Sequence, residues 1–212
     1  MSGHDHSHES ENLPPLEGAG GPALENLVLE EAIRELLIEK EVIEAREVER
    51  LLEVLQTRRP ALGARLVTRI WTDPDFRKLA LENGKAAAEL ELGINLVEAP
   101  EIIFLENTPK RHHLVVCTLC SCYPTYIMGP SPTWYRSKAF RARVVKEPRA
   151  VLAEFNTDLP EDVEIRVVDS TAEVRYLVVP VRPGGSEGMN REALAHLVNR
   201  DSMIGAALAD RP

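Results

Sequence analysis

All three cysteines of the 212-residue chain lie in one short stretch, at positions 117, 120 and 122. The thiolate is the form of cysteine that binds metals and acts as a nucleophile. Because three sulfurs at this spacing can face one ion from the same side, the pattern predicts a metal site in residues 117–122, which we call the cysteine loop. Three thiolates leave the rest of the coordination sphere to other ligands.

Two ways to complete this sphere are equally open from the spacing. A structural zinc would take a fourth ligand, for which His112 and His113 lie just upstream, although the apolar run that follows them is typical of a strand entering the loop. Alternatively, the main-chain amides of Ser121 and Cys122, deprotonated by a strongly Lewis-acidic ion, would give a catalytic centre with an open position. An iron–sulfur cluster normally takes four cysteines, and a disulfide would leave an odd thiol, so both are disfavoured.

Residues 116–123, Val-Cys-Thr-Leu-Cys-Ser-Cys-Tyr, closely resemble the metal claw of the nitrile hydratase alpha subunit and of its relative, the thiocyanate hydrolase gamma subunit. Other segments resemble landmarks of the same family, and together they extend the resemblance from about residue 26 to about residue 207. This ordered set is more specific than the cysteine spacing alone. The resembling segments are residues 71–76, 106–108, 134–137, 141–145, 169–176, 182–183 and 201–205.

The resemblance implies a ligand set. Cys117 would be an axial thiolate, Cys120 a cysteine sulfinic acid and Cys122 a cysteine sulfenic acid. The amides of Ser121 and Cys122 would also bind the metal, and the sixth position would hold water, hydroxide or substrate. Thr118 stands where cobalt-type members carry Thr and iron-type members carry Ser, so the resemblance implies one cobalt ion, Co3+, per chain rather than iron. The sulfenate oxygen of Cys122 would be a candidate nucleophile.

The implied activity is that of an enzyme, a hydro-lyase that hydrates a nitrile to the corresponding amide. In such an enzyme this chain would be the metal-bearing alpha subunit of a hetero-oligomer. A beta-type subunit would supply arginines to the negatively charged centre, and a cobalt-loading activator protein would deliver the metal. The thiocyanate hydrolase gamma subunit and a structural zinc-binding module are the alternative functions.

Asp169, Glu173 and Arg175 match a family set that orients the metal ligands by hydrogen bonding, with a plain turn and ion pair as the alternative. Two positions depart from the family pattern. Thr125 replaces a common Trp, which predicts a larger pocket, and Glu98 aligns with a Gln near the active site, where a carboxylate would act as a general base or reposition water. Together they favour a bulky nitrile such as toyocamycin.

Composition narrows the partners and the compartment. The net charge of −9 argues against nucleic acid, since phosphate binding needs a basic surface. No apolar run is long enough to span a bilayer and the N-terminus does not resemble a signal peptide, so a cytoplasmic location is expected.

The chain divides into three predicted parts: a disordered, His-rich tail (1–22), a helical arm that wraps a partner subunit (23–92), and a catalytic metal domain (93–212). The predicted fold class is α+β, with the arm followed by a layered α-β-β-α metal-binding domain. Prolines after the cysteine loop predict a non-helical exit. Helices are expected at 24–55, 60–71, 85–92, 148–155 and 190–199, strands at 102–105 and 114–116, and a pair of strands at 163–168 and 174–181.

Overall fold

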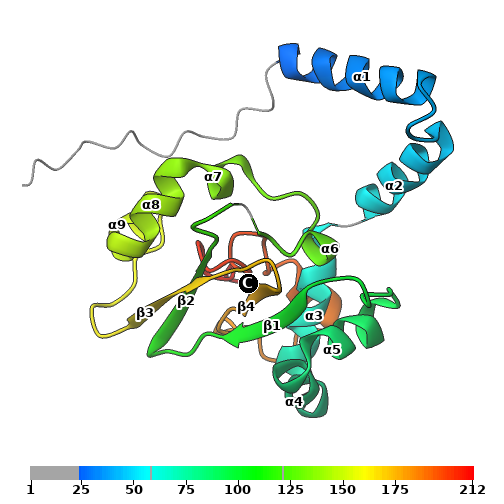
Figure 1. Cartoon of the computed structure of the whole chain (residues 1–212). Helices are drawn as coiled ribbons and strands as arrows, with labels where there is room; N and C mark the ends of the chain where they lie inside the picture. Colours follow the sequence, from blue (N-terminus) through cyan, green and yellow to red (C-terminus); the bar gives the residue numbers. More distant parts are fainter. Residues whose placement is uncertain (1–23, 58, 121) are drawn as a thin grey trace, which may run out of the picture.

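The computed structural model describes residues 24–57, 59–120 and 122–212 (Figure 1). The predicted disordered tail (1–22) lies outside these residues. Helices and short parallel strands share one buried core, so the predicted α+β class is confirmed. Within the part of the chain that the structure describes, no helix has the length and apolar character needed to cross a membrane.

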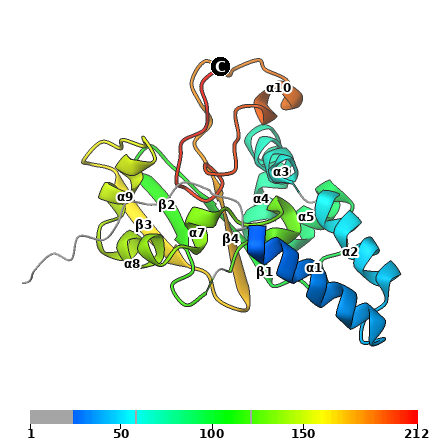
Figure 2. The same cartoon turned by 90° about the horizontal axis from the view of Figure 1, so that it is seen from above.

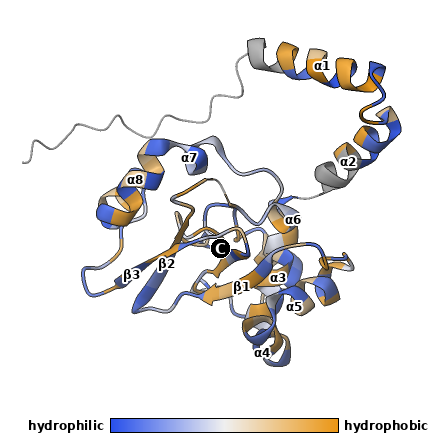
Figure 3. Cartoon of the chain, viewed as in Figure 1, coloured by the Kyte–Doolittle hydropathy of each residue, from blue (hydrophilic) through white to orange (hydrophobic). Residues whose placement is uncertain are grey.

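The predicted arm begins with two helices, α1 (Leu24–Glu39) and α2 (Ala45–Thr57), which extend away from the remainder of the chain (Figure 1). Among the side chains that the structure describes, those of α1 and α2 contribute none to the core. Figure 3 shows hydrophobic residues along α1, and Leu29, Ile33 and Leu36 are all exposed. A helix with an uncovered apolar face is typical of a segment that packs on another chain.

Three further helices follow, α3 (Pro60–Thr72), α4 (Pro74–Glu82) and α5 (Gly84–Leu92). Their boundaries are set locally, because the side chain of Asp73 accepts from Phe76 N–H (2.9 Å) and that of Asn83 accepts from Ala86 N–H (3.0 Å). Unlike α1 and α2, these helices share the buried core with the strands. The change in packing therefore lies near Pro60, and the predicted domain division at Gly93 stays a prediction.

Within the described residues, four strands form two parallel pairs. Strand β1 (Glu101–Glu106) pairs with β4 (Val174–Val179), and β2 (Arg111–Val116) pairs with β3 (Glu164–Asp169). The prediction that the two later strands pair with each other is therefore wrong. The turn at 170–173 reverses the chain between them, but each strand completes a ladder with an earlier strand.

The directions of the strands determine where the cysteine loop lies. Strands β2 and β3 run in parallel toward it, with Val116 opposite Asp169, and β4 starts just after the turn that follows β3. The ends of three strands thus meet around the loop. Parallel strands distant in sequence can therefore bring Asp169 and Arg175 to the same place as the cysteines.

The C-terminal segment joins the two strand pairs. Val115 N–H on β2 donates to Ile204 O (2.9 Å), and Val178 N–H on β4 donates to Met203 O (2.8 Å). The backbone of Gly205 has a φ of +84°, and a Cβ there would lie 1.9 Å from the carbonyl oxygen of His113. Only glycine permits this close approach of the segment to β2.

The remaining helices complete the layers. Helices α3–α5 cover the β1–β4 side, and α7–α9 gather beside β2 and β3 (Figure 2), which gives the predicted α-β-β-α order.

The predicted non-helical exit from the cysteine loop is wrong, because α6 forms one turn directly after Pro124, a residue compatible with a helix start. The helix predicted at 190–199 is shorter in the structure, where α10 ends at Ala195. The bounds are α6 Thr125–Met128, α7 Thr133–Arg136, α8 Lys138–Lys146, α9 Pro148–Glu154 and α10 Arg191–Ala195.

Candidate metal centre

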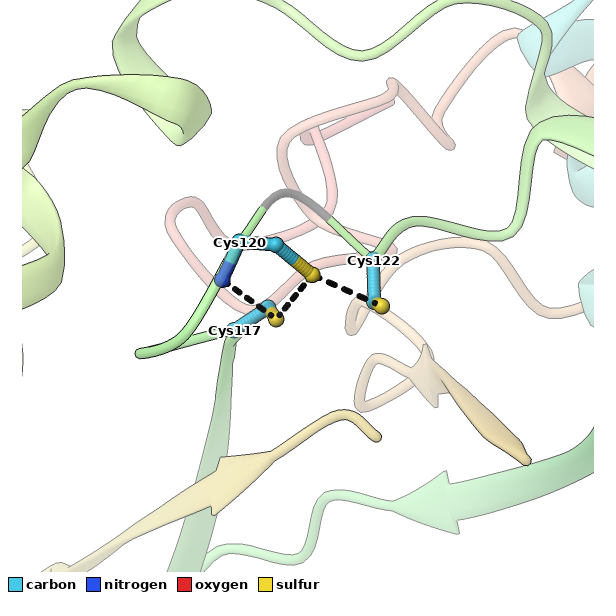
Figure 4. A group of neighbouring side chains, drawn as sticks. All are labelled: Cys117, Cys120 and Cys122. Carbon is cyan, nitrogen blue, oxygen red and sulfur yellow. Dashed lines mark hydrogen bonds between the residues drawn. The ribbon is translucent and has the colours of Figure 1, made fainter. Parts of the chain in front are cut away.

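The three cysteine sulfurs converge at the end of β2 (Figure 4). The Sγ of Cys120 lies 3.2 Å from that of Cys117 and 3.1 Å from that of Cys122, and all three atoms lie within 4.8 Å of one another. Cys117 is buried, Cys122 is half-buried and Cys120 is exposed. The loop therefore presents a sulfur cluster that is anchored inside the fold and open on its outer side.

The electrostatics of the cluster fit a cation. Burial and the neighbouring sulfurs raise the pKa of Cys122 to about 12, while the positive charge of Arg175 opposes this rise. The Cys122 thiol would thus keep its proton at neutral pH without a compensating positive charge. A bound metal ion would supply that charge, because a thiol that coordinates a metal does so as the thiolate and releases its proton to solvent.

The entry half of the loop is tied to β3 and α8. Thr118 donates its N–H to Asp169 Oδ1 (2.9 Å) and its hydroxyl to Asp169 Oδ2. Arg141 Nη1 donates to the Thr118 carbonyl oxygen (3.2 Å), and Ser170 N–H donates to Val116 O (2.7 Å). Asp169 thus hydrogen-bonds to the loop, and its role in orienting metal ligands stays a prediction.

The exit half is held by a residue that the sequence reasoning did not single out. The hydroxyl of Tyr135 on α7 donates to the carbonyl oxygen of Cys122 (2.8 Å). Burial raises the pKa of Tyr135 above its ordinary value, so the hydroxyl stays a donor. The family-like segment 134–137 contained this tyrosine, but nothing in the sequence indicates that it reaches the loop.

Arg175 lies beside the cluster, where its charge acts on Cys122. Its guanidinium is fixed on the turn before β4, since Nη1 donates to the carbonyl oxygens of Thr171, Ala172 (3.3 Å) and Val174 (3.1 Å). Glu173 is exposed and accepts from the Thr171 hydroxyl (2.9 Å) instead of turning to the sulfurs.

The two upstream histidines are engaged elsewhere. His112 Nε2–H donates to Gly205 O (2.6 Å), and its Nδ1 accepts from the side-chain amide of Asn107 (3.1 Å). His113 donates its backbone N–H (2.8 Å) and its Nδ1–H (3.1 Å) to Asn107 Oδ1. Burial lowers the pKa of both rings, so both are neutral hydrogen-bonding groups of β2. The group of metal-ligating side chains found among the described residues contains no histidine.

The other predicted site residues have mixed positions. Ser121 lies outside the described residues. Thr125 is half-buried at the first position of α6, three residues after Cys122. Glu98 is exposed in the turn before β1 and is not part of the metal-ligating group found among the described residues.

Sequence comparisons identify relatives of this chain. A family model described as nitrile hydratase, alpha chain, matches residues 25–207. A nitrile hydratase subunit alpha from Rhodococcus sp is 46% identical over 183 residues, which cover 85% of this chain and 92% of the relative. A thiocyanate hydrolase subunit gamma from Thiobacillus thioparus is 44% identical, with 85% and 79% covered. A cobalt-containing nitrile hydratase subunit alpha from Pseudonocardia thermophila is 43% identical, with 82% and 86% covered.

Solved structures with a similar fold come from the same types of enzyme. A recombinant thiocyanate hydrolase with partially modified cobalt centres superposes with a TM-score of 0.81 at 43% identity, covering 87% of this chain and 90% of the other. A double mutant of the Fe-type nitrile hydratase from Comamonas testosteroni Ni1 gives a TM-score of 0.82 at 37% identity, covering 91% and 94%. Both metal types thus occur among the structural relatives. The chain belongs to the nitrile hydratase alpha-chain family, and so to the metal-bearing subunits of this class of enzyme.

Proposed function

We propose that this chain is the alpha subunit of a cobalt-dependent nitrile hydratase, which adds water to a nitrile and yields the amide. The observation that carries the proposal is the convergence of three cysteine sulfurs within 4.8 Å of one another in a loop of this family. Thr118 supports cobalt rather than iron, as do the cobalt-containing relatives.

In this proposal the metal is held by Cys117, Cys120 and Cys122 through sulfur and by the amides of Ser121 and Cys122. Cys120 is a sulfinic acid and Cys122 a sulfenic acid, whose oxygen is a candidate nucleophile toward the nitrile carbon. When bound, Co3+ supplies a strong Lewis acid that polarises a ligand at the open position and lowers the pKa of water.

Residues around the loop hold this arrangement together. The ligand set, with three sulfur anions and two amidates around a trivalent ion, is negative overall, and a partly buried negative cluster needs cations nearby. Arg175 supplies one, through its charge at Cys122, and Arg141 another, through the Thr118 carbonyl. Asp169 fixes the entry half of the loop by accepting both Thr118 donors.

Two residues bear on the substrate. Thr125 follows the loop closely and is small where an indole is common in the cobalt branch, which supports a pocket for a bulky nitrile such as toyocamycin. Glu98 has the chemistry to take a proton from an attacking water or to position that water. It is exposed in the turn before β1, where a partner subunit could cover it.

A beta-type subunit completes the site. The outer side of the loop is open, with Cys120 exposed and the Leu119 side chain 90% exposed, and the apolar face of α1 is also uncovered. We infer that the beta-type subunit covers both, supplies arginines to the oxidised cysteines and excludes water. A cobalt-loading activator protein and a cytoplasmic location belong to the same proposal.

Thiocyanate hydrolase is the second candidate, favoured by the 44% identity to its gamma subunit. The two enzymes differ in substrate, so the chain purified with its partner subunit is assayed with a nitrile and with thiocyanate. We expect amide from the nitrile. Carbonyl sulfide and ammonia from thiocyanate, without hydration of the nitrile, would support the second candidate instead.

Metal analysis and mass spectrometry of the peptide spanning the three cysteines test the centre itself. We expect one cobalt per chain, two added oxygens on Cys120 and one on Cys122. Stoichiometric zinc with no added oxygen would replace the catalytic proposal with a structural zinc site.

Single substitutions test the ligands. Cys117→Ala, Cys120→Ala and Cys122→Ala should each abolish cobalt retention and turnover while circular dichroism shows a folded chain. Cobalt and full activity retained in any one of them would contradict the ligand assignment.

A further inference from the structure

We propose that Tyr135 is a positioning residue of the metal centre, which fixes the main chain of Cys122 and through it the direction of the Cys122 sulfur. The inference rests on the proposed metal-binding function. It starts from a hydrogen bond that joins α7 to the exit half of the loop, the 2.8 Å bond from the Tyr135 hydroxyl to Cys122 O.

The two halves of the loop are held by different parts of the fold. The entry half is fixed by Asp169 at the end of β3 and by Arg141 of α8. The exit half returns toward α6 through Tyr123 and Pro124, and it is at Cys122 that Tyr135 reaches the main chain. Loss of this bond would therefore remove a side-chain anchor from the exit half and leave the anchors of the entry half in place.

The Tyr135 hydroxyl is held in place by packing. The residue is fully buried, and its ring lies edge-on to Tyr123 (centroids 5.2 Å apart) and Trp134 (5.9 Å) and against Phe140 (5.8 Å). A ring enclosed on three sides in a close-packed interior cannot turn to another rotamer. The position of the hydroxyl, and with it that of the Cys122 carbonyl, is therefore set by the core.

A fixed carbonyl restricts rotation of the backbone at Cys122. The Sγ of Cys122 lies 3.1 Å from that of Cys120, and in the proposed centre Cys122 supplies both a sulfur and an amide ligand. A small rotation at this residue would move both donors together. Tyr135 itself touches neither the metal nor the substrate and acts through Cys122.

The chain offers a matched control. The Tyr123 hydroxyl is buried in the same aromatic cluster, next in sequence to Cys122, and has no hydrogen-bond partner among the described residues. Tyr135→Phe and Tyr123→Phe thus each remove one buried hydroxyl from one cluster. Only the first removes a hydrogen bond to the loop.

The test compares wild type, Tyr135→Phe and Tyr123→Phe, each purified with the beta-type subunit. For Tyr135→Phe we expect kcat on one nitrile to fall about 10- to 100-fold with little change in KM, as is usual for residues that orient metal ligands. At equal cobalt content we also expect its visible absorption band to shift. In full-length chain produced without cobalt, the thiols of this variant should react faster with 5,5′-dithiobis(2-nitrobenzoate). Tyr123→Phe should match wild type in each respect.

Several outcomes overturn the proposal. One is a Tyr135→Phe enzyme that equals wild type in absorption, kcat and thiol reactivity. Another is an equal change in Tyr135→Phe and Tyr123→Phe. If the Tyr135→Phe chain does not fold, Tyr135 contributes to the stability of the whole fold and not specifically to the position of the loop. If wild type itself binds no cobalt and hydrates no nitrile, the proposed function fails, and the thiol reactivity of the cobalt-free chains still decides whether Tyr135 fixes the loop.

Discussion

The carboxylate of Asp169 accepts both the backbone N–H and the hydroxyl of Thr118, although 51 residues separate the two in sequence. Asp169 is the last residue of β3, and Thr118 follows the buried Cys117 at the end of β2. The parallel register that sets Val116 opposite Asp169 creates this contact. The start of the cysteine loop is thereby fixed to a strand end instead of being left to its own flexibility.

Asp169→Ala should weaken cobalt retention about 10- to 100-fold, because the entry half of the loop loses both acceptors. The side chains are exposed, so the free energy of unfolding should fall by only about 1 kcal/mol. Cobalt loss to a chelator and urea unfolding measure the two effects. Asp162→Ala, which removes an exposed carboxylate paired with Lys110, is the control. Equal cobalt retention in both variants would show that the contact does not support the metal site.

Leu119→Ser should weaken association with the beta-type subunit. The side chain is 90% exposed in the free chain, and its burial against a partner would contribute about 1.5–3 kcal/mol. The dissociation constant should therefore rise about 10- to 150-fold, while the melting temperature of the isolated chain stays the same. Leu90→Ser, at a 61% exposed position on α5, serves as the control for loss of a surface leucine. An unchanged dissociation constant for Leu119→Ser would mean that the partner does not cover the loop.

Glu91→Gln should destabilise the fold by about 3 kcal/mol at neutral pH, because it leaves guanidinium groups without their buried anion. The Glu91 side chain is only 7% exposed and pairs with Arg69 (2.8 Å), Arg65 (3.6 Å) and Arg191, which joins α5 to α3 and α10. Burial raises the pKa of Glu91, but hydrogen bonds from Arg69 and Arg191 outweigh it, so the pKa lies below its ordinary value of 4.5.

A lowered carboxyl pKa means that the unfolded chain binds the proton more readily than the folded chain. The stabilisation by Glu91 is thus fully present above pH 4.5 and is lost as the pH falls through the folded-state pKa. The difference in unfolding free energy between wild type and Glu91→Gln should shrink over that range in urea titrations. Glu164→Gln, at a half-exposed ion pair, should change the free energy of unfolding by less than about 1 kcal/mol. A difference for Glu91→Gln that is independent of pH would contradict the ion-pair explanation.

Thr125→Trp should shift substrate preference toward small nitriles, because the indole would fill space beside the cysteine loop. The ratio of kcat/KM for a bulky to a small aliphatic nitrile should fall about tenfold or more, in line with the effect of steric exclusion from a pocket. Thr125→Ser, which keeps the size and the hydroxyl, is the control. An unchanged ratio in Thr125→Trp would place this side chain away from the substrate.

The sequence by itself determined the features that depend on neighbouring residues. Cysteines at i, i+3 and i+5 must meet because one short loop carries all three, and the starts of α4, α5 and α10 follow from the capping side chains of Asp73, Asn83 and Asn190. Family membership was also readable, since it rests on short segments in a fixed order.

Only the tertiary structure decided which strands pair and what surrounds the cysteines. A short turn between β3 and β4 favoured a hairpin, but the ladder partner of a strand depends on long-range packing, and here the 201–206 segment hydrogen-bonds to both pairs. The contacts of Thr118 with Asp169 and of Cys122 with Tyr135 follow from that arrangement. Hydrogen bonds between residues so far apart in the chain leave no periodic signal in the sequence.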